Sequence, residues 1–258
     1  MEPQIIFEDE NLLVVDKPAG VIVNKADSAK GLVTLQDWVE KKYAIQKIKP
    51  LSDLEKSKYV VEGYNKYDEF VSRSGIVHRL DKETSGIILI ARNAETFINL
   101  QNQFKSGTVS KTYTTLVHGR VEKESGEIDA PIGRLPWNRM RFGVFPQGRS
   151  AQSKYKVLSY KLHKTGKTQE TLSLVEVYPK TGRTHQIRVH FQYINHPVFG
   201  DELYAGRKTG RQDRQEVDRH FLHASKIHIM HPTTNQSTDF ESALPSSLSI
   251  FLNKLTDA

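Results

Sequence analysis

One stretch constrains the fold more than any other part of the sequence. Residues 75–90 read Gly-Ile-Val-His-Arg-Leu-Asp-Lys-Glu-Thr-Ser-Gly-Ile-Ile-Leu-Ile. The aliphatic run at the end of this stretch is typical of a buried strand in a sheet. The charged residues before it are framed by Gly75 and Gly86, so we expect them to form a rigid turn at the edge of that sheet.

The charged turn contains one candidate for chemistry. Asp81 lies between Arg79 and Lys82. A carboxylate flanked by cations stays ionised and can act as a nucleophile or as an electrostatic stabiliser. The alternative is a solvated ion pair on the surface, which is common in turns beside strands. The turn by itself does not choose between these interpretations.

Apolar runs and alternating segments predict many short strands and few helices. Strands are predicted at residues 5–7, 12–15, 21–23, 87–90, 111–119, 170–178 and 221–229. Helices are predicted at 34–42 after Thr34, at 93–105 between Asn93 and Gly107, after Thr184, and from Pro245 to Leu255. The strands show no regular alternation with helices, which predicts an α+β fold with a largely antiparallel sheet.

The composition excludes several classes of protein. The 258 residues contain no cysteine, which excludes disulfides, thiolate metal sites and cysteine nucleophiles. No apolar run approaches the roughly 18 residues of a membrane span, and the N-terminus lacks the layout of a signal peptide. His185 and His190 are five residues apart, which is not the helical spacing of a zinc pair. A cytoplasmic or organellar protein fits this composition, and we expect a cytoplasmic monomer with no metal and no membrane association.

Positive charge is concentrated in one segment. The chain has a net charge of +7, yet residues 130–169 contain no Asp or Glu. This segment holds nine cations: Arg134, Arg139, Arg141, Arg149, Lys154, Lys156, Lys161, Lys164 and Lys167. Aromatic residues, among them Trp137 and Phe142, are interleaved with them. Cations for phosphates and aromatic rings for bases are what RNA binding requires; the alternative is a pair of solvated basic strands.

Three blocks of sequence resemble one known family. Residues 77–86, Val-His-Arg-Leu-Asp-Lys-Glu-Thr-Ser-Gly, resemble the signature of the RluA-type RNA pseudouridine synthases. Residues 13–20 are similar to the family's opening segment, and residues 181–190 to its late motif, in the same order. The resemblance implies the pseudouridine synthase fold, with a central mixed sheet, surrounding helices and loops, and one RNA-binding cleft.

The resemblance also implies a domain organisation. We expect residues 1–258 to be a single catalytic domain, and the opening motif begins so early that no N-terminal RNA-binding appendage is expected. Two polar segments, 43–73 and 205–220, are predicted to be surface insertions. The second is Arg-rich and is predicted to be a flexible loop.

Site residues follow from the matched motifs. By resemblance Asp81 is the nucleophile, Arg183 pairs with it, and Tyr113 packs on the uracil. Arg79 has the length and planar head to fill the space of a base that leaves its stack. The other RNA-binding candidates are His78, Lys17, Lys111, Arg134, Arg139, Arg141 and Arg149. For Lys17 a solvent-facing role stays open, and for His78 a structural role within the turn.

The function that the resemblance implies is the isomerisation of specific uridines to pseudouridine in structured RNA, without a cofactor. Ribosomal RNA is expected before transfer RNA, because the segment 132–155 looks like that of members acting on ribosomal RNA. A non-catalytic RNA-binding or ribosome-assembly factor with the same fold is the alternative. A hydrolase of glycosidic bonds is a third hypothesis and needs a second acid, for which Glu83 is the near candidate.

Overall fold

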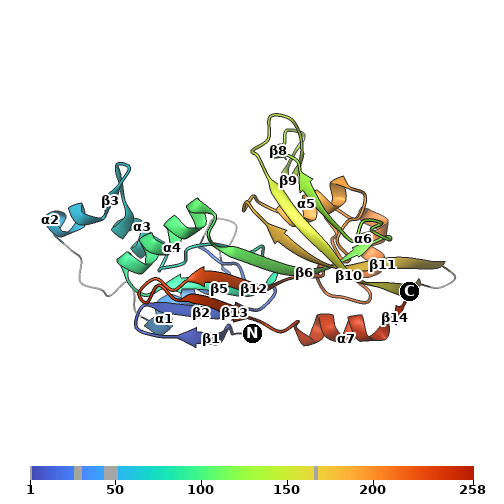
Figure 1. The fold of residues 1–258 in the computed structure, drawn as a ribbon. Helices are drawn as coiled ribbons and strands as arrows, with labels where there is room; N and C mark the ends of the chain where they lie inside the picture. The colour runs from blue at the N-terminus through green and yellow to red at the C-terminus, as the bar shows by residue number, and fades with distance from the viewer. Residues whose placement is uncertain (1, 26–30, 44–51, 166–167) are drawn as a thin grey trace. The chain divides into compact units, whose positions relative to one another are not determined.

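The structure is a computed structural model that describes residues 2–25, 31–43, 52–165 and 168–258 (Figure 1). Contacts between residues divide the chain into two compact units. Unit 1 consists of Met1–Val109 and Ile227–Ser242, and unit 2 consists of Ser110–Lys226 and Ala243–Ala258. That the whole chain acts as one catalytic domain stays a prediction.

The sheet strands of unit 1 follow the order β1-β2-β5-β12, with β13 paired to β12; β12 belongs to unit 1 from Ile227 onward and to unit 2 up to Lys226. Their bounds are β1 Gln4–Glu8, β2 Leu12–Lys17, β5 Ser85–Ala91, β12 Leu222–Met230 and β13 Ser237–Glu241. Strand β2 pairs antiparallel with both β1 and β5. Every residue of β5 is buried, as the aliphatic run at its centre predicts.

Unit 1 also contains helices. They are α1 Leu35–Tyr43, α2 Asp53–Lys56, the 3-10 helix η3 Ser57–Tyr59, α3 Lys66–Ser72 and α4 Ala94–Ser106, with a small hairpin of β3 Val60–Val61 and β4 Tyr64–Asn65. Helix α4 contacts β5 and α3. It begins after Asn93, whose side chain accepts from the Thr96 backbone amide, and ends at Gly107 in the left-handed conformation.

Unit 2 contains the longer strands. Its main sheet has the order β12-β6-β11-β10-β14, with β7 paired to β10. The bounds are β6 Ser110–His118, β7 Ser125–Asp129, β10 Gln152–Thr165, β11 Thr168–Pro179 and β14 Thr256–Asp257. The pairs β6–β11 and β10–β11 are antiparallel. A separate hairpin of β8 Ile132–Leu135 and β9 Asn138–Val144 stands above this sheet in Figure 1.

The described part of unit 2 also contains the helices α5 Gln186–Tyr193, α6 Arg207–Asp213 and α7 Ser246–Lys254. Ile187 and Phe191 of α5 pack with Val175 and Val177 of β11 in one core cluster. Phe199, Phe221 and Phe251 belong to a second core cluster. The chain is thus an α+β protein built on a large, mainly antiparallel sheet, as the sequence predicts.

The structure corrects three local predictions. Residues 21–23 form no strand, because the carbonyls of Ile22 and Val23 accept from the first amides of α1. Helix α5 is preceded by His185, at φ 56°, and not capped by Thr184. Residues 205–220 are not a loop throughout, since they contain α6 and bury Asp213 and Arg219. No helix in the described ranges is long and apolar enough to cross a membrane.

Residues 44–51 of the predicted insertion 43–73 lie outside the described ranges. The part that is described, from Ser52 onward, contains short elements and not an irregular loop. Ser52 and Glu55 form a capping box at the start of α2. Asn65 caps α3, which buries Tyr67 and Phe70. That this segment is an insertion relative to the family stays a prediction.

Candidate functional site

The turn that contains Asp81 is fastened to the end of strand β5. Gly75 has φ +76°, and a Cβ at this position would lie 2.0 Å from the carbonyl oxygen of Ala91. The amide of Ala91 donates to the Gly75 carbonyl at 2.8 Å. Only glycine permits this close approach of two backbone segments. A β-bridge between Ile76 and Ile90 continues the contact toward the turn.

His78 holds the next part of the turn. Its Nε2 accepts a hydrogen bond of 2.9 Å from the Leu89 amide, and its ring packs against Phe104 with centroids 4.9 Å apart. An imidazole that accepts at Nε2 is neutral and carries its proton on Nδ1. Of the two roles open for His78 in the sequence, the geometry supports the structural one. The sequence identified both alternatives, but periodicity alone could not rank them.

Lys17 corrects a prediction made from the sequence. Its side chain is fully buried, and its ammonium donates to the carbonyls of Pro18, Val21 and Lys82 at 2.9, 2.9 and 3.1 Å. The interpretation of Lys17 as an RNA-facing or solvent-facing cation is therefore wrong. A buried ammonium needs such hydrogen-bond partners. The strand period gave a clue, because it places Lys17 on the same face of β2 as Leu13 and Val15.

The Lys82 carbonyl links two turns of unit 1. It accepts from Lys17 and also from the amide of Gly20, at 2.8 Å. The Thr84 amide donates to the Asp81 carbonyl at 3.1 Å, which closes the turn. Asp81 itself is half-buried, while Arg79 and Lys82 are exposed. The half-buried Asp81, with exposed Arg79 and Lys82 near it in the sequence, thus lies in a turn whose backbone these hydrogen bonds hold.

In unit 2 the structure brings Lys111 to the motif of residues 181–190. Lys111 and Tyr113 lie two residues apart on β6, and Tyr113 pairs with Val177 of β11. The Lys111 ammonium lies 3.4 Å from the Thr181 carbonyl, and burial lowers its pKa to about 8. A lysine with so low a pKa can exchange its proton near neutral pH. Tyr113 is half-buried at the edge of the core.

Gln186 anchors the loop that carries Arg183. Its Oε1 accepts from the Thr181 hydroxyl at 2.7 Å and from the Arg183 amide at 3.0 Å. Its Nε2 donates to the Gln152 carbonyl at 2.9 Å and to the Ser153 hydroxyl at 3.0 Å. Sequence reasoning missed this residue, because a single buried glutamine has no periodic pattern that reveals it.

Arg183 is half-exposed on this anchored loop. Its Nε donates to the Ser150 carbonyl at 2.9 Å, a bond that uses one of the three guanidinium nitrogens. Burial, together with the neighbouring charge of Arg149, lowers the pKa of Arg183. Arg149 is exposed beside it. A guanidinium near another cation favours an anionic partner.

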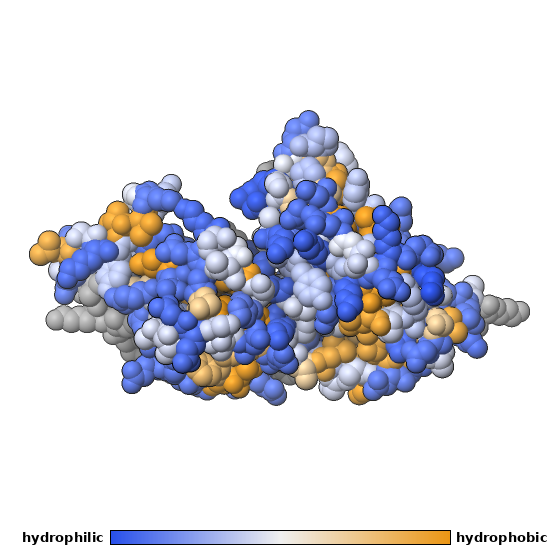
Figure 2. Space-filling model, in the orientation of Figure 1, coloured by the Kyte–Doolittle hydropathy of each residue, from blue (hydrophilic) through white to orange (hydrophobic). Residues whose placement is uncertain are grey.

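The β8–β9 hairpin carries most of the remaining RNA-binding candidates. Arg134 is exposed and lies over the ring of Phe142, with 5.1 Å from its Cζ to the ring centroid. Trp137, in the turn, is 81% exposed. Arg141 is half-buried over Tyr204. Arg139 lies in β9, but its side chain is outside the described ones. The surface over this hairpin is mainly hydrophilic in Figure 2.

The histidines have partners within the protein. His185 bonds to the Tyr204 hydroxyl, and His190 lies between Ser153 and the Ala130 carbonyl. His228 pairs with Asp239, and His231 with Asp9. In the part of the chain that the structure describes, no group of three or more His, Cys, Asp or Glu could hold a metal ion.

The candidate residues are distributed over both units. Asp81, Arg79, His78 and Lys17 belong to unit 1. Tyr113, Lys111, Arg183 and the cations of the hairpin belong to unit 2. Within unit 1 the turn of Asp81 is held by Lys17 and His78. Within unit 2 Lys111 contacts the loop of Arg183, which Gln186 anchors.

Comparison with solved structures agrees on the fold. The structure of human RNA pseudouridylate synthase domain containing 1 superposes with a TM-score of 0.70, over 100% of this chain and 89% of that one. The two sequences are 24% identical, so this likeness concerns the fold alone. The fold is that of the pseudouridine synthases.

Sequence comparisons identify the family. A family model described as RNA pseudouridylate synthase matches residues 11–193. An uncharacterized RNA pseudouridine synthase of Chloroflexus aurantiacus is 41% identical over 185 residues, which are 72% of this chain and 54% of that protein. The ribosomal large subunit pseudouridine synthase D of Pseudomonas aeruginosa is 34% identical over 264 residues, covering 99% of this chain and 72% of that protein. The chain therefore belongs to the RNA pseudouridylate synthase family, a class of isomerases that modify RNA.

Proposed function

We propose that this chain converts uridine to pseudouridine in RNA, and that its substrate is ribosomal RNA of the large subunit. The observation that carries the activity is the family match over residues 11–193, which includes Asp81, Tyr113 and Arg183. The substrate is supported by similarity along 99% of the chain to a protein named for the large ribosomal subunit. We expect the chain to work as a monomer in the cytoplasm, as the sequence predicts.

The reaction exchanges one bond to the sugar for another. The bond from C1′ of the ribose to N1 of uracil breaks, the base turns, and a bond from C1′ to C5 forms. The proton on C5 leaves and N1 gains a proton, so no electrons enter or depart. The enzyme must supply a nucleophile, a group that moves the proton and a pocket that retains the detached base.

Asp81 is the nucleophile in this proposal. Its support is the match to the family signature together with its setting, a half-buried carboxylate between exposed Arg79 and Lys82. Neighbouring cations favour the ionised form that a nucleophile requires. Lys17 and His78 act as positioning residues, because Lys17 bonds to the Lys82 carbonyl next to Asp81 and the His78 side chain accepts from the Leu89 amide of β5.

Arg183 and Tyr113 complete the proposed catalytic set. We infer that Arg183 binds the Asp81 carboxylate and orients it, which suits the planar fork of a guanidinium. Tyr113 is proposed to pack on the uracil ring while the base is detached. Lys111, with its pKa of about 8, lies two residues away on the same strand and contacts the loop of Arg183. It adds positive charge for the RNA backbone below that pH.

RNA binding requires both phosphate contacts and extraction of one base. Removing a base from its stack costs a few kcal/mol, and Arg79 is proposed to fill the space that the uridine leaves. Arg134, Arg139, Arg141 and Arg149 are proposed to bind phosphates, which fix position and not sequence. The exposure of Arg134 and Arg149 supports this role most directly.

The test is an isomerisation assay on RNA labelled with tritium at C5 of uridine. Transcribed fragments of large-subunit RNA and a transfer RNA are incubated with the protein and with the Asp81→Asn variant. Pseudouridine formation releases tritium to water, and we expect release from ribosomal RNA with the wild type and none with the variant. Tritium release by a sequence-verified Asp81→Asn protein would remove Asp81 from the mechanism.

The same assay separates the alternatives. A hydrolase would release free uracil and keep the tritium on the base. A non-catalytic assembly factor would bind ribosomal RNA, yet release neither tritium nor base. Tritium release from transfer RNA alone would retain the activity and overturn the proposed substrate.

A further inference from the structure

Helix α6 has an inner side that is fixed to the rest of unit 2. Gly210 and Asp213 are its buried residues. A Cβ on Gly210 would lie 2.8 Å from the Cα of Glu202, so the helix packs directly against backbone at that point. A substitution there would push α6 away. The close packing at Gly210 therefore shows which side of α6 faces the protein, which the mostly polar sequence of the helix does not reveal.

Two of the three acidic residues in 205–220 pair with histidines: Asp213, which is buried, and Glu216, which is exposed; the third, Asp218, is exposed. Asp213 Oδ2 lies 3.0 Å from His118 Nε2 and accepts from the Gly200 amide at 2.9 Å. Just beyond the helix, Glu216 Oε1 lies 2.7 Å from His163 Nε2. Burial lowers the pKa of His118, but its hydrogen bonds to Asp213 and Glu170 outweigh burial and raise it to about 9. The negative charge of Asp213 is thus neutralised inside the protein.

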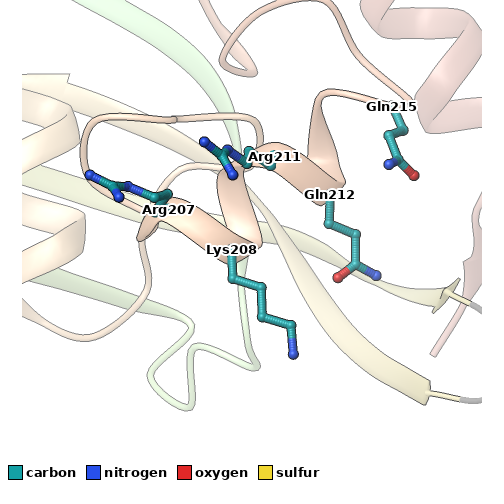
Figure 3. Close-up of a pocket in the computed structure, with 5 residues that line it drawn as sticks. All are labelled: Arg207, Lys208, Arg211, Gln212 and Gln215. Atoms are coloured by element: carbon teal, nitrogen blue, oxygen red, sulfur yellow. The ribbon is translucent and has the colours of Figure 1, made fainter.

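The outer side of α6 is cationic. A shallow pocket of about 520 Å³ is lined by Arg207, Lys208, Arg211, Gln212 and Gln215 (Figure 3). The lining has three cations, two amides and no acid. Arg207 and Arg211, and likewise Lys208 and Gln212, are four residues apart and so are neighbours on the helix surface. In Figure 3 Lys208 and Gln212 project to the same side of α6.

We propose that this pocket binds the phosphate backbone of the RNA substrate, at a place separate from the residues assigned above. Guanidinium groups bind phosphate bidentately, and a lysine ammonium binds it as a point charge. The glutamine amides can donate to phosphate or sugar oxygens, which carry no sequence information. An open pocket of this kind suits a strand that passes across it. The inference rests on the proposed function, because it takes its ligand to be that RNA.

The test removes the three cations and keeps the helix. In the variant R207Q/K208Q/R211Q all three changed residues are exposed, so the fold is expected to persist, which thermal unfolding checks. The matched control K41Q/K123Q/K254Q removes the same amount of charge at exposed lysines elsewhere. Affinity for a transcribed large-subunit fragment and for an unrelated RNA is measured over a range of salt concentrations.

The expected result is specific to the α6 variant. Its affinity for both RNAs falls by at least about tenfold near 0.1 M salt, and the slope of log affinity against log salt becomes shallower by about 0.7 to 0.9 for each phosphate that is no longer bound. KM rises while kcat stays within about twofold, since this binding is equally strong before and during reaction. The control retains most of the affinity and slope.

Two outcomes would overturn the inference that the α6 pocket binds the RNA backbone. Both can be distinguished from a result that refutes the isomerase activity. If the α6 variant and the control bind RNA alike, the pocket takes no RNA and the weaker binding reflects net charge alone. If the α6 variant discriminates between the two RNAs, the pocket reads sequence and does not bind the backbone. A wild type that binds these RNAs but releases no tritium would refute the isomerase activity and leave the binding result intact.

Discussion

At the scale of single residues, the cations Lys17 and Arg183 have different surroundings and different roles. Lys17 is buried and bonds to three carbonyls, whereas Arg183 is half-exposed and makes one bond to a carbonyl through Nε. The ammonium of Lys17 thus stabilises the backbone of the turns around it. The guanidinium of Arg183 lies on an anchored loop and is partly exposed to solvent. This difference gives two predictions with distinct readouts.

Lys17→Met is expected to lower the free energy of unfolding by about 2 kcal/mol or more, because buried carbonyls lose their donor. The value of kcat should also fall, since the Lys82 carbonyl beside Asp81 loses a hydrogen bond. Urea denaturation and the tritium assay measure these effects. Lys41→Met, at an exposed position of α1, is the control. Equal stability of the two variants would show that the three hydrogen bonds contribute little.

Arg183→Lys is expected to reduce kcat strongly while the fold persists. An ammonium cannot hold a carboxylate bidentately, and it also cannot reproduce the bond from Nε to the Ser150 carbonyl. Steady-state kinetics with separate kcat and KM test this. Normal kcat in the lysine variant would exclude Arg183 as the partner of Asp81 in the proposed mechanism.

At the scale of elements, pairs of histidine and carboxylate side chains link strands to α6 and the residues after it, whereas the β8–β9 hairpin presents exposed side chains. His118 of β6 and His163 of β10 share Glu170 of β11, at 3.1 and 3.3 Å. The same histidines reach Asp213 of α6 and Glu216. The β8–β9 hairpin instead exposes Trp137. The first arrangement affects stability and the second affects binding.

The His118 cluster predicts how stability depends on pH. The pKa of His118 is raised to about 9 in the folded protein, so its stabilising contribution is complete below its ordinary value of 6.5 and is lost as pH rises through 9. The wild type should therefore exceed His118→Gln in unfolding free energy by more at pH 6 than at pH ~9.5. Urea denaturation at both values tests this. A pH-independent difference would mean that the charged histidine is not what stabilises α6.

The stabilising contribution of Glu170, which pairs with His118 and His163, depends on pH in the opposite direction. Burial raises the pKa of Glu170, but its hydrogen bonds to His118 and His163 prevail and lower it to about 2. The contribution of Glu170 is present above its ordinary value of 4.5 and is lost as pH falls toward 2. The same denaturation series extended to about pH 3 should therefore show declining stability, and the decline should be smaller in Glu170→Gln.

Trp137→Ala should weaken RNA binding without changing stability. A ring that is 81% exposed contributes little to the core, whereas stacking on a base is worth about 1–3 kcal/mol. Filter binding and thermal unfolding measure the two properties. Tyr193→Ala, on a ring that is 55% exposed at the end of α5, is the control. Unchanged affinity in the tryptophan variant would assign Trp137 no base contact.

At the scale of the whole molecule, the net charge of +7 is unevenly distributed. Residues 130–169 carry nine cations and no acid, and the α6 pocket adds three more cations, all in unit 2. An uneven distribution of this kind gives attraction to a polyanion that is independent of its sequence. Unit 2 is thus expected to supply most of the salt-dependent part of RNA affinity.

The double variant R134Q/R149Q tests whether exposed arginines of unit 2 supply the salt-dependent part of RNA affinity. Both side chains are exposed, and if both bind phosphate as proposed, their removal should make the slope of log affinity against log salt shallower by about 1.4 to 1.8. K123Q/K254Q removes the same charge and should change the slope little. A salt titration compares them. Identical slopes in both variants would show that net charge, and not these two arginines, governs the salt dependence.

The sequence by itself determined those helices and strands whose bounds and burial depend on residues close together in the chain. Asn93 and Gly107 bound α4 because capping depends on residues within one turn of the helix end. The aliphatic run in β5 predicted a buried strand because burial on both faces leaves no polar position. The family motifs named Asp81, Tyr113 and Arg183, whose catalytic roles stay predictions.

The tertiary structure alone decided which polar groups are paired across the chain. Lys17 bonds to a carbonyl 65 residues away, and His118 to a carboxylate 95 residues away. It also decided that α6 forms in a segment whose polar sequence predicted a loop. Periodicity reports which face of an element is apolar, but a buried charge is stable only where folding supplies its partner. That partner comes from another element, so no local pattern contains it.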